Sequence, residues 1–375
     1  MELNRVLAKT LEKQLFKGKT LIVIGSRQVG KTTLINHVIQ HYESFLFLDG
    51  DDSQVRQILS NNNTAEIKQI IGNHKIVFID EAQRINHIGL TAKIIHDQFK
   101  DVQLILSGSS ALELNNAVNE TLTGRKLEYH LYPISWGELV TQNGYLNSLQ
   151  NLNNRLIYGM YPDIIVNPGQ EKEFLKNLTE SYLYKDILAL GNIKKPDVLE
   201  RLLQALAYQI GSEVSYNELS SLLGVAKETI ISYIQLLENA YIVFRIGSYS
   251  NNLRNEIKNS KKIYFYDNGI RNAIINAYNP IDLRSDKGVL WENFLISERV
   301  KYLEYNQIYS KNYFWRTKGQ QEIDWIEIKD LKVKAYEFKW KGAEKVKFPN
   351  AFVEAYQPEL EAIDKTNFNV FLGGG

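Results

Sequence analysis

A glycine-rich loop near the amino terminus has the residue types that bind phosphate groups. It reads GSRQVGKT over residues 25–32 and stands between an apolar run and a helical pattern, which is the full arrangement of a phosphate-binding loop. Gly25 and Gly30 allow backbone conformations that turn amide groups toward a phosphate chain, and the following helix N-terminus adds positive potential. Lys31 is expected to reach the β- and γ-phosphates, and the Thr32 hydroxyl to ligate Mg²⁺. The residues expected to contact a nucleotide are Gly25, Ser26, Arg27, Gln28, Val29, Gly30, Lys31, Thr32 and Thr33.

Two carboxylates end a later apolar run. Ile76 to Ile79 are followed directly by Asp80 and Glu81, and a buried strand that ends in two carboxylates is costly unless they face a cleft or a cation. We expect Asp80 to hold the Mg²⁺ shell, and Glu81 to orient and activate the attacking water. Glu81 therefore favours hydrolysis over transfer to a small acceptor. The alternative is a pair of carboxylates in a surface turn.

Two further polar residues are candidates for the same chemistry. Ser109 follows the apolar run 102–106, where its hydroxyl would sense the γ-phosphate or hold the water, although serines are common in any turn. Arg125 precedes the predicted strand 126–132 and is a candidate arginine finger that acts across a subunit interface. That role would require a homo-oligomer, and a surface salt bridge is the alternative.

A third group of charges lies near the carboxyl terminus, in the stretch EIDWIEIKDLKVKAYEFKWK at residues 322–341. The stretch predicts two strands joined by a turn. If the turn has even length, Asp324 lies directly opposite Glu337, and Lys339 shares the face of Glu337 because strand side chains alternate. Apolar residues nearer the turn share this face, so the charges continue a core-facing surface. With an odd-length turn Asp324 would face away from Glu337.

Two close carboxylates repel each other and are best explained by a divalent cation. We expect Asp324 and Glu337 to ligate Mg²⁺, and Lys339 to orient water or stabilise a pentacovalent phosphate. Glu292, in the first turn of a preceding amphipathic helix, would complete this catalytic set. The alternatives are an ion pair between Glu337 and Lys339 on an exposed strand, or an inactive domain retained for binding.

These residues need a sheet to position them. Strands expected at residues 20–24, 45–49, 76–79, 102–106 and 126–132 alternate with helical patterns and predict an α/β domain with a parallel sheet. Their order suits a sheet with an extra strand between the phosphate-loop strand and the carboxylate strand. Residues from about 149 to 210 are expected to form a helical connector.

The next segment fits a helix-turn-helix. Helices are expected over residues 216–223 and 227–239, with Gly224 at the turn, followed by two strands and an intervening wing. The second helix offers few cations for phosphate contacts, whereas the wing offers more. The wing cations are Arg254, Lys258, Lys261 and Lys262. The segment therefore either contacts DNA or serves as a protein-packing module.

A run of motifs in order resembles a large prokaryotic family of AAA-like ATPases with a C-terminal domain of unknown function. The motifs are GSRQVGKTT, FIDEAQ, LSGSSALEL, TGRKLEYHLYPISWGEL and GMYPDII. The resemblance spans nearly the whole chain and implies ATP as the nucleotide. It also implies phosphate-binding roles for Lys31 and Thr32, a Mg²⁺ role for Asp80 and a water-activating role for Glu81.

The C-terminal helix, hairpin and Glu-x-Lys pattern resemble the restriction-endonuclease-like PD-(D/E)xK nucleases. The departure is Glu-Ile-Asp at residues 322–324 in place of Pro-Asp. The expected fold class is thus α/β: an AAA-like P-loop sheet, a helical and winged-helix connector, and an α/β nuclease-like domain. We expect domain boundaries at residues 1–145, 146–210, 211–280 and 281–375.

The bulk composition limits the function classes. The chain has 375 residues, 44% of them hydrophobic, a net charge of +1 and no cysteine. The absence of cysteine excludes disulfides, cysteine-type zinc sites and thiol catalysis. The net charge is close to zero, so it gives no reason by itself to expect nucleic-acid binding. No signal-peptide pattern and no apolar run of about twenty residues occurs, so we expect a cytoplasmic protein without membrane helices.

The leading hypothesis is an ATP-hydrolysing, DNA-associated protein whose ATP state controls a C-terminal nuclease-like domain. The rival is an ATP-dependent signalling switch whose C-terminal modules only bind DNA or protein. A small-molecule kinase is disfavoured by Glu81 and by the lack of an evident acceptor pocket.

Overall fold

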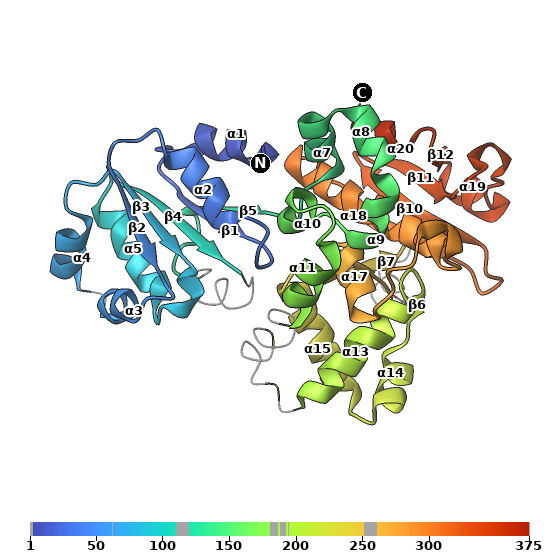
Figure 1. Ribbon diagram of the computed structural model, residues 1–375, viewed down its shortest axis with the longest axis horizontal. Helices are drawn as coiled ribbons and strands as arrows, with labels where there is room; N and C mark the ends of the chain where they lie inside the picture. The colour runs from blue at the N-terminus through green and yellow to red at the C-terminus, as the bar shows by residue number, and fades with distance from the viewer. Residues whose placement is uncertain are drawn as a thin grey trace. The chain divides into compact units, whose positions relative to one another are not determined.

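The computed structural model describes residues 3–374 apart from 62, 110–119, 181–186, 188–192, 194 and 251–260. The chain forms two compact units (Figure 1). The first comprises Met1–Tyr132 with Asn239–Tyr241, and the second Pro133–Glu238 with Ile242–Gly375. Among the helices of the described ranges, none is long and apolar enough to cross a membrane.

The first unit is built on a five-stranded parallel sheet in the order β2-β3-β4-β1-β5. Strands β1, β3 and β4 are buried along their whole length, because their near-continuous apolar sequences suit a sheet covered on both faces. Strand β4 lies between β1 and β3, so the predicted extra strand is confirmed. The strands are β1 (Thr20–Ile24), β2 (Phe45–Asp49), β3 (Ile76–Asp80), β4 (Gln103–Gly108) and β5 (Lys126–His130).

The helices of this unit follow the strands in α/β order. Helix α2 begins at Lys31, within the last two residues of the phosphate-binding motif, as the sequence predicts. The capping is local: Asp52 accepts a hydrogen bond from the amide of Gln54 at 2.7 Å and so starts α3. The helices are α1 (Val6–Gln14), α2 (Lys31–Ile39), α3 (Ser53–Ser60), α4 (Thr64–Ile71), η1 (Ala82–Arg84) and α5 (Ile88–Gln98).

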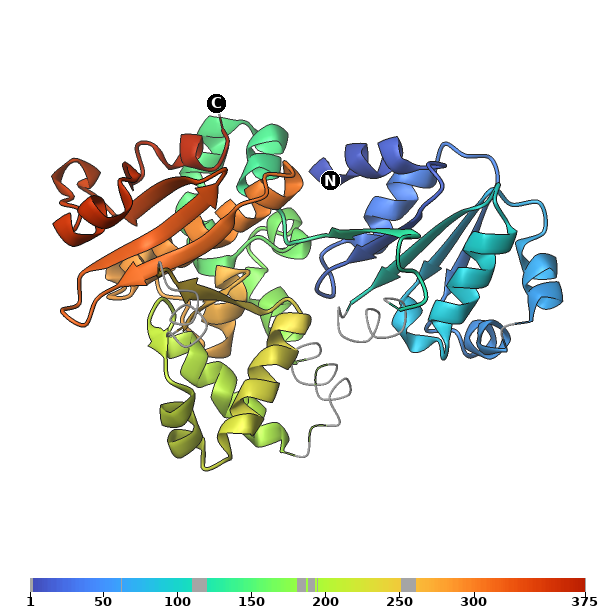
Figure 2. The same ribbon diagram turned by 180° about the vertical axis from the view of Figure 1, so that it is seen from behind.

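The second unit contains a seven-stranded sheet in the order β12-β11-β10-β9-β7-β8-β6, whose long orange strands are clearest in Figure 2. Strand β7 pairs in parallel with β9 at Gly247 and Ser248. The sheet therefore runs across residue 280, where we expected a domain boundary. Its strands are β6 (Glu213–Val214), β7 (Val243–Ser248), β8 (Lys261–Phe265), β9 (Lys311–Arg316), β10 (Glu322–Lys329), β11 (Lys332–Phe338) and β12 (Glu359–Ile363).

The helix-turn-helix has the bounds that the sequence predicts, with α14 at Tyr216–Leu223 and α15 at Lys227–Asn239. The Ser215 hydroxyl accepts a hydrogen bond from the amide of Glu218 at 3.3 Å and caps α14. Gly224 ends that helix with a left-handed φ of 66°, a conformation that glycine adopts without strain. Strands β7 and β8 then pair antiparallel.

The segment PISWGEL, which we expected at the end of the first domain, packs inside the second unit. Its Ser135 and Glu138 form a capping box that starts α7 (Trp136–Asn143). The Trp136 amide donates to a Glu298 carboxylate oxygen at 2.5 Å. The Trp136 ring packs edge-on against Phe294, so these residues belong to the core of the second unit.

Helix α18 (Lys287–Tyr305), the longest among the described residues of this unit, carries the buried Trp291, Phe294 and Leu295. It brings Glu292 to the sheet. The other helices are α8 (Tyr145–Gln150), α9 (Leu152–Tyr158), α10 (Pro162–Val166), α11 (Glu171–Leu178), α13 (Pro196–Tyr208), α17 (Asn268–Ile274), η3 (Ile281–Leu283), η4 (Ala343–Lys345), α19 (Asn350–Tyr356) and α20 (Phe368–Phe371).

Candidate functional site

The glycine-rich loop of the first unit follows β1 at the carboxyl edge of the sheet. A Cβ atom at Gly25 would clash with the carbonyl oxygen of Leu131, so a side chain has no room there. Gly30 has a φ of +91° and forms the left-handed turn into α2, a conformation that L-residues with side chains rarely adopt. Both glycines are therefore required by the backbone itself.

Lys31 is folded onto this loop. Its Nζ donates to the carbonyl oxygens of Gly25 at 2.9 Å and Ser26 at 3.0 Å, and the side chain is only 5% exposed. Burial lowers the pKa of Lys31, while Glu81 and Asp80 act in the opposite direction. The ammonium thus lies where phosphate oxygens would offer it stronger acceptors than two carbonyls.

Asp80 at the end of β3 gathers the groups that would surround a cation. The Thr32 hydroxyl donates to Asp80 Oδ2 at 2.5 Å, and the Ser107 hydroxyl donates to Oδ1. A hydroxyl and a carboxylate oxygen from two elements therefore meet at one point. Hard oxygen donors of this kind, completed by waters and phosphates, fit Mg²⁺.

Glu81 is held by two neighbours. The Gln83 side-chain amide donates to Glu81 Oε2 at 2.6 Å and to Ser109 Oγ at 3.0 Å. Ser109 in turn donates to Glu81 Oε2 at 3.1 Å. The structure thus brings Ser109 to the predicted base. Gln83 was missed, although its position within FIDEAQ, two residues after Glu81, was the available signal.

Arg125 lies away from this group. Strand β5 pairs with β1 so that Lys126 is opposite Thr20, the first residue of β1, whereas the phosphate loop follows the last. Arg125 Nε donates to Asp97 Oδ1 at 2.9 Å, and the arginine side chain is 38% exposed. The salt bridge we gave as the alternative is therefore present, and the arginine-finger role, which requires a second subunit, stays a prediction.

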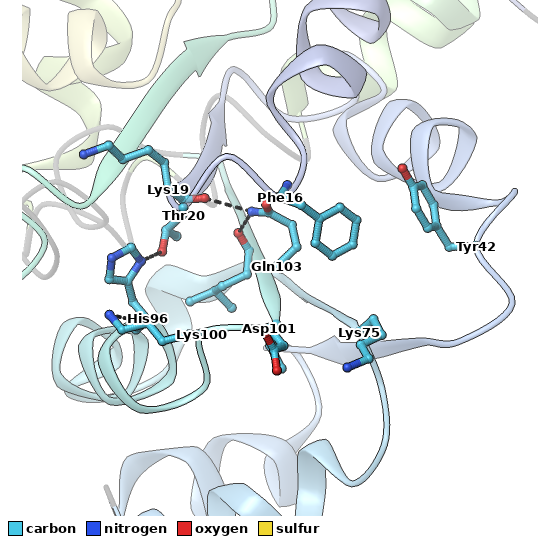
Figure 3. Close-up of a pocket in the computed structure, with 12 residues that line it drawn as sticks. Phe16, Lys19, Thr20, Tyr42, Lys75, His96, Lys100, Asp101 and Gln103 are labelled. Atoms are coloured by element: carbon cyan, nitrogen blue, oxygen red, sulfur yellow. Dashed lines mark hydrogen bonds between the residues drawn. The ribbon is translucent and has the colours of Figure 1, made fainter.

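A cavity of about 790 Å³ opens at the same amino edge of the sheet (Figure 3). Gln103 organises it: its Oε1 accepts from the Phe16 amide at 2.6 Å, and its Nε2 donates to the Lys19 carbonyl at 2.9 Å. Phe16 and Tyr42 lie 5.7 Å apart between ring centroids. None of the expected nucleotide contacts lines this cavity.

In the second unit, β10 and β11 form the predicted hairpin. Its turn is the two-residue segment Asp330–Leu331, with φ values of 50° and 65°, and Trp325 pairs with Tyr336. The even-length turn is therefore confirmed, and the same register places Asp324 opposite Glu337. The backbone amide of Phe338 donates to Asp324 Oδ2 at 2.7 Å.

The predicted apolar face of this hairpin is also present. Ile326 and Ala335 are fully buried in a cluster with Ile323, Trp315 and Phe352. A register shift between β9 and β10 separates Ile323 from Ile326, and both contribute to the same cluster. Such a bulge re-aims the intervening side chains, here those of Asp324 and Trp325.

Four carboxylates gather beside this hairpin, and we call them, with their partners, the carboxylate cluster. Glu292 Oε1 accepts from the Tyr264 hydroxyl at 2.7 Å and from Lys262 Nζ at 3.2 Å. Lys262 also pairs with Glu322. Lys339 Nζ donates to Glu337 Oε2 at 2.8 Å. The members are Glu292, Glu322, Asp324, Glu337, Lys262, Tyr264 and Lys339.

The protonation of the cluster reflects burial and crowding. Burial raises the pKa of Asp324 well above its usual range, and the charges of Glu292 and Glu337 raise it further. Burial also raises the pKa of Glu337, against the effect of Lys339. For Lys262, burial alone would lower the pKa, but the carboxylates of Glu292 and Glu322 raise it, so its ammonium stays charged.

The cluster differs from the Mg²⁺ site that we expected at Asp324 and Glu337. Within the described residues, no group of three or more histidine, aspartate or glutamate side chains is arranged to hold a metal ion. The ammonium of Lys262 instead contacts two of the carboxylates. As the side chains stand, their donor set does not fit a divalent ion.

The wing prediction needs correction at one residue. Lys262 was expected to be a surface cation, but it lies on β8 and is 1% exposed. Arg254 and Lys258 lie outside the described residues. Sequence reasoning missed this position because side chains of β8 alternate between the two faces of the sheet. Which face meets the cluster is known only once β8 is seen to pair with β7, and β7 with β9.

An open groove of about 510 Å³ adjoins the cluster, and we call it the lysine groove. Four ammonium groups line it, against one carboxylate, that of Glu337, which Lys339 neutralises. The lysines are Lys339, Lys341, Lys345 and Lys347. A strongly positive surface therefore borders the hairpin.

Three family models match successive parts of the chain. Residues 17–140 match a model described as an AAA domain. Residues 149–280 and 287–370 match two domains of unknown function, DUF8612 and DUF4143. The first match supports a P-loop, AAA-like ATPase domain, as the sequence motifs indicate, and the other two name no activity.

Similar proteins cover most of the chain at low identity. The uncharacterized protein MJ1544 of Methanocaldococcus jannaschii is 23% identical over 396 aligned positions, covering 98% of this chain and 84% of the relative. An uncharacterized protein of Haemophilus influenzae is 24% identical and covers 68% of each chain. The Walker-type ATPase PABY2304 of Pyrococcus abyssi is 15% identical with a TM-score of 0.49, covering 72% of this chain and 94% of that chain.

Proposed function

We propose that the protein hydrolyses ATP and that its nucleotide state controls DNA binding by its C-terminal, nuclease-like unit. One observation carries the ATPase part: Lys31, the Thr32–Asp80 pair and Glu81 lie together at the carboxyl edge of one parallel sheet. This edge is where open α/β sheets bind ligands.

Each side chain has a separate task in hydrolysis. Lys31 would exchange its two carbonyl contacts for β- and γ-phosphate oxygens. Thr32 and Asp80 would hold Mg²⁺, which neutralises charge on the phosphates when bound. Glu81, oriented by Gln83 and Ser109, would accept the proton of the attacking water. These roles do not require a residue from another subunit.

The lysine groove supports the DNA part of the proposal. DNA affinity is dominated by Lys and Arg contacts to phosphates, and four lysines converge on this groove. The second helix of the helix-turn-helix offers less, since its Gln235 amide oxygen already accepts from Arg245 at 2.8 Å. We therefore assign the main phosphate contacts to the groove rather than to that helix.

The test follows ATP turnover and DNA binding in the same preparation. Lys31→Ala should abolish ATP hydrolysis, and retained turnover would refute the ATPase assignment. Lys345→Ala/Lys347→Ala should weaken DNA binding and reduce the slope of log K against log salt by about 2, because each phosphate contact contributes about 0.9. DNA affinity of wild type should also change between ATP and ADP.

The matched control is Lys329→Ala/Lys332→Ala. It also removes two lysines, but from beside the turn of the β10–β11 hairpin and outside the lysine groove. This variant should leave the salt slope unchanged. If the two variants lose the same affinity, the groove has no special role. DNA affinity that is the same in ATP and ADP, together with ATP turnover that does not change on adding DNA, would contradict the proposal. A switch that acts on a protein partner would then replace it.

A further inference from the structure

We propose that the ammonium of Lys262 is the resident cation of the carboxylate cluster and excludes a divalent metal ion from it. The inference concerns the C-terminal unit alone and goes beyond the proposed ATPase and DNA-binding functions. It implies that the carboxylate cluster does not support Mg²⁺-dependent cleavage of phosphodiesters.

The first argument is the position of Lys262. Its side chain is 1% exposed, and its Nζ lies 3.2 Å from Glu292 Oε1 and also pairs with Glu322. The ammonium further lies 5.3 Å from the centre of the Phe314 ring. A buried ammonium is tolerated only when it is paired, and here its partners come from α18 and β10, two different elements.

The second argument is the charge of the cluster. Arg316 Nε lies 3.7 Å from Glu322 and adds a cation. The cluster therefore holds three cations, Lys262, Arg316 and Lys339, beside its four carboxylates. Side-chain cations thus compensate most of its negative charge without a metal ion.

The third argument is steric and electrostatic competition. A Mg²⁺ ion needs oxygens at 2.0–2.1 Å in near-octahedral geometry. Glu292, the residue expected to complete the metal set, already accepts from both Lys262 and Tyr264. An incoming dication would have to break these contacts and would meet the like charge of a buried ammonium.

The experiment measures Mn²⁺ binding by isothermal titration calorimetry without nucleotide. All proteins carry Asp80→Asn, which removes the cation ligand of the ATP site. The parent should show no stoichiometric Mn²⁺ binding at pH 7.5. Lys262→Met in this background should gain one Mn²⁺ site, at least tenfold tighter than any binding by the parent, and Asp324→Asn should abolish the gain.

Lys262→Arg is the control, because it keeps the positive charge and should gain no Mn²⁺ site. A parent protein that binds one Mn²⁺ ion and loses it on Asp324→Asn overturns the proposal. So does a folded Lys262→Met protein that gains no site. If Lys262→Met fails to fold, Mn²⁺ binding is compared between the parent and its Asp324→Asn variant. Only a metal site at the cluster would make the two proteins bind Mn²⁺ differently, so this comparison still decides the question.

Discussion

The Gln83 side-chain amide donates to Glu81 at 2.6 Å and, through the same nitrogen, to Ser109 at 3.0 Å. One glutamine therefore fixes the predicted base of hydrolysis and the end of the neighbouring strand. Its Oε1 is buried and has no hydrogen-bond partner among the described residues. This oxygen can accept a hydrogen bond from a water held beside Glu81.

We expect Gln83→Ala to lower kcat for ATP hydrolysis about 10- to 100-fold with little change in KM, because the base loses its orientation while the phosphate contacts remain. Steady-state kinetics measures both constants. Gln98→Ala, at the end of α5, is the control and should behave as wild type. An equal rise in KM would indicate instead that Gln83 shapes the phosphate loop.

Thr32→Val should raise the Mg²⁺ concentration needed for half-maximal ATPase rate, because it removes the hydroxyl that meets Asp80 at 2.5 Å. A shift of about tenfold or more corresponds to the loss of one charge-assisted contact. A Mg²⁺ titration at saturating ATP measures the shift. Thr33→Val, one residue on, should have a smaller effect.

Leu331→Gly should stabilise the second unit by about 1 kcal/mol. Leu331 is 98% exposed and has a φ of 65°, so its side chain adds strain at the turn without burial. Chemical denaturation measures the change. Leu331→Ala, which keeps a Cβ atom, should give little of the gain, and an equal gain from alanine would contradict the backbone explanation.

Because of Asp286, the stability of the folded protein should fall as the pH is lowered in the acidic range. Burial acts to raise its pKa, but hydrogen bonds from Arg284 and Arg271 prevail and lower it to about 2. A carboxylate whose pKa is lower in the folded protein than in the unfolded chain stabilises the fold at pH values above the unfolded-state pKa of about 3.9. This stabilisation is lost as the pH falls toward 2. After allowance for solvent screening, the contribution is about 1–2 kcal/mol.

Asp286→Asn should therefore destabilise the protein most at neutral pH, and the difference from wild type should shrink between about pH 5 and pH 2. Denaturation at a series of pH values measures this. Asp282→Asn, on the neighbouring short helix η3, is the control. A difference that does not change with pH would mean that packing, and not charge, explains the effect of Asp286.

The sequence was most informative where neighbours in the chain determine structure. The strand, glycine loop and helix around Lys31 are contiguous, so spacing alone predicts them. The hairpin register follows from turn parity and from which face is apolar. The sequence therefore predicts that Asp324 and Glu337 lie opposite each other if the turn has even length, and the structure supplies that length.

It was least informative where distant segments meet. Lys262 reads as one more cation in a basic stretch, and only the pairing of β8 with β7 turns it inward. Trp136 follows the last strand of the first unit by a few residues, yet its partners Glu298 and Phe294 are more than 150 positions away. Local patterns carry no information about such partners.

The pairing of β7 with β9 has a practical consequence for dissecting the protein. A recombinant fragment that starts at residue 281 would leave β9 as an open edge, with the backbone groups that now bond Gly247 and Tyr249 exposed. Exposed edges of this kind recruit other chains. Such a fragment should aggregate, whereas one that starts at Pro133 retains the whole seven-stranded sheet and is the better choice for expression.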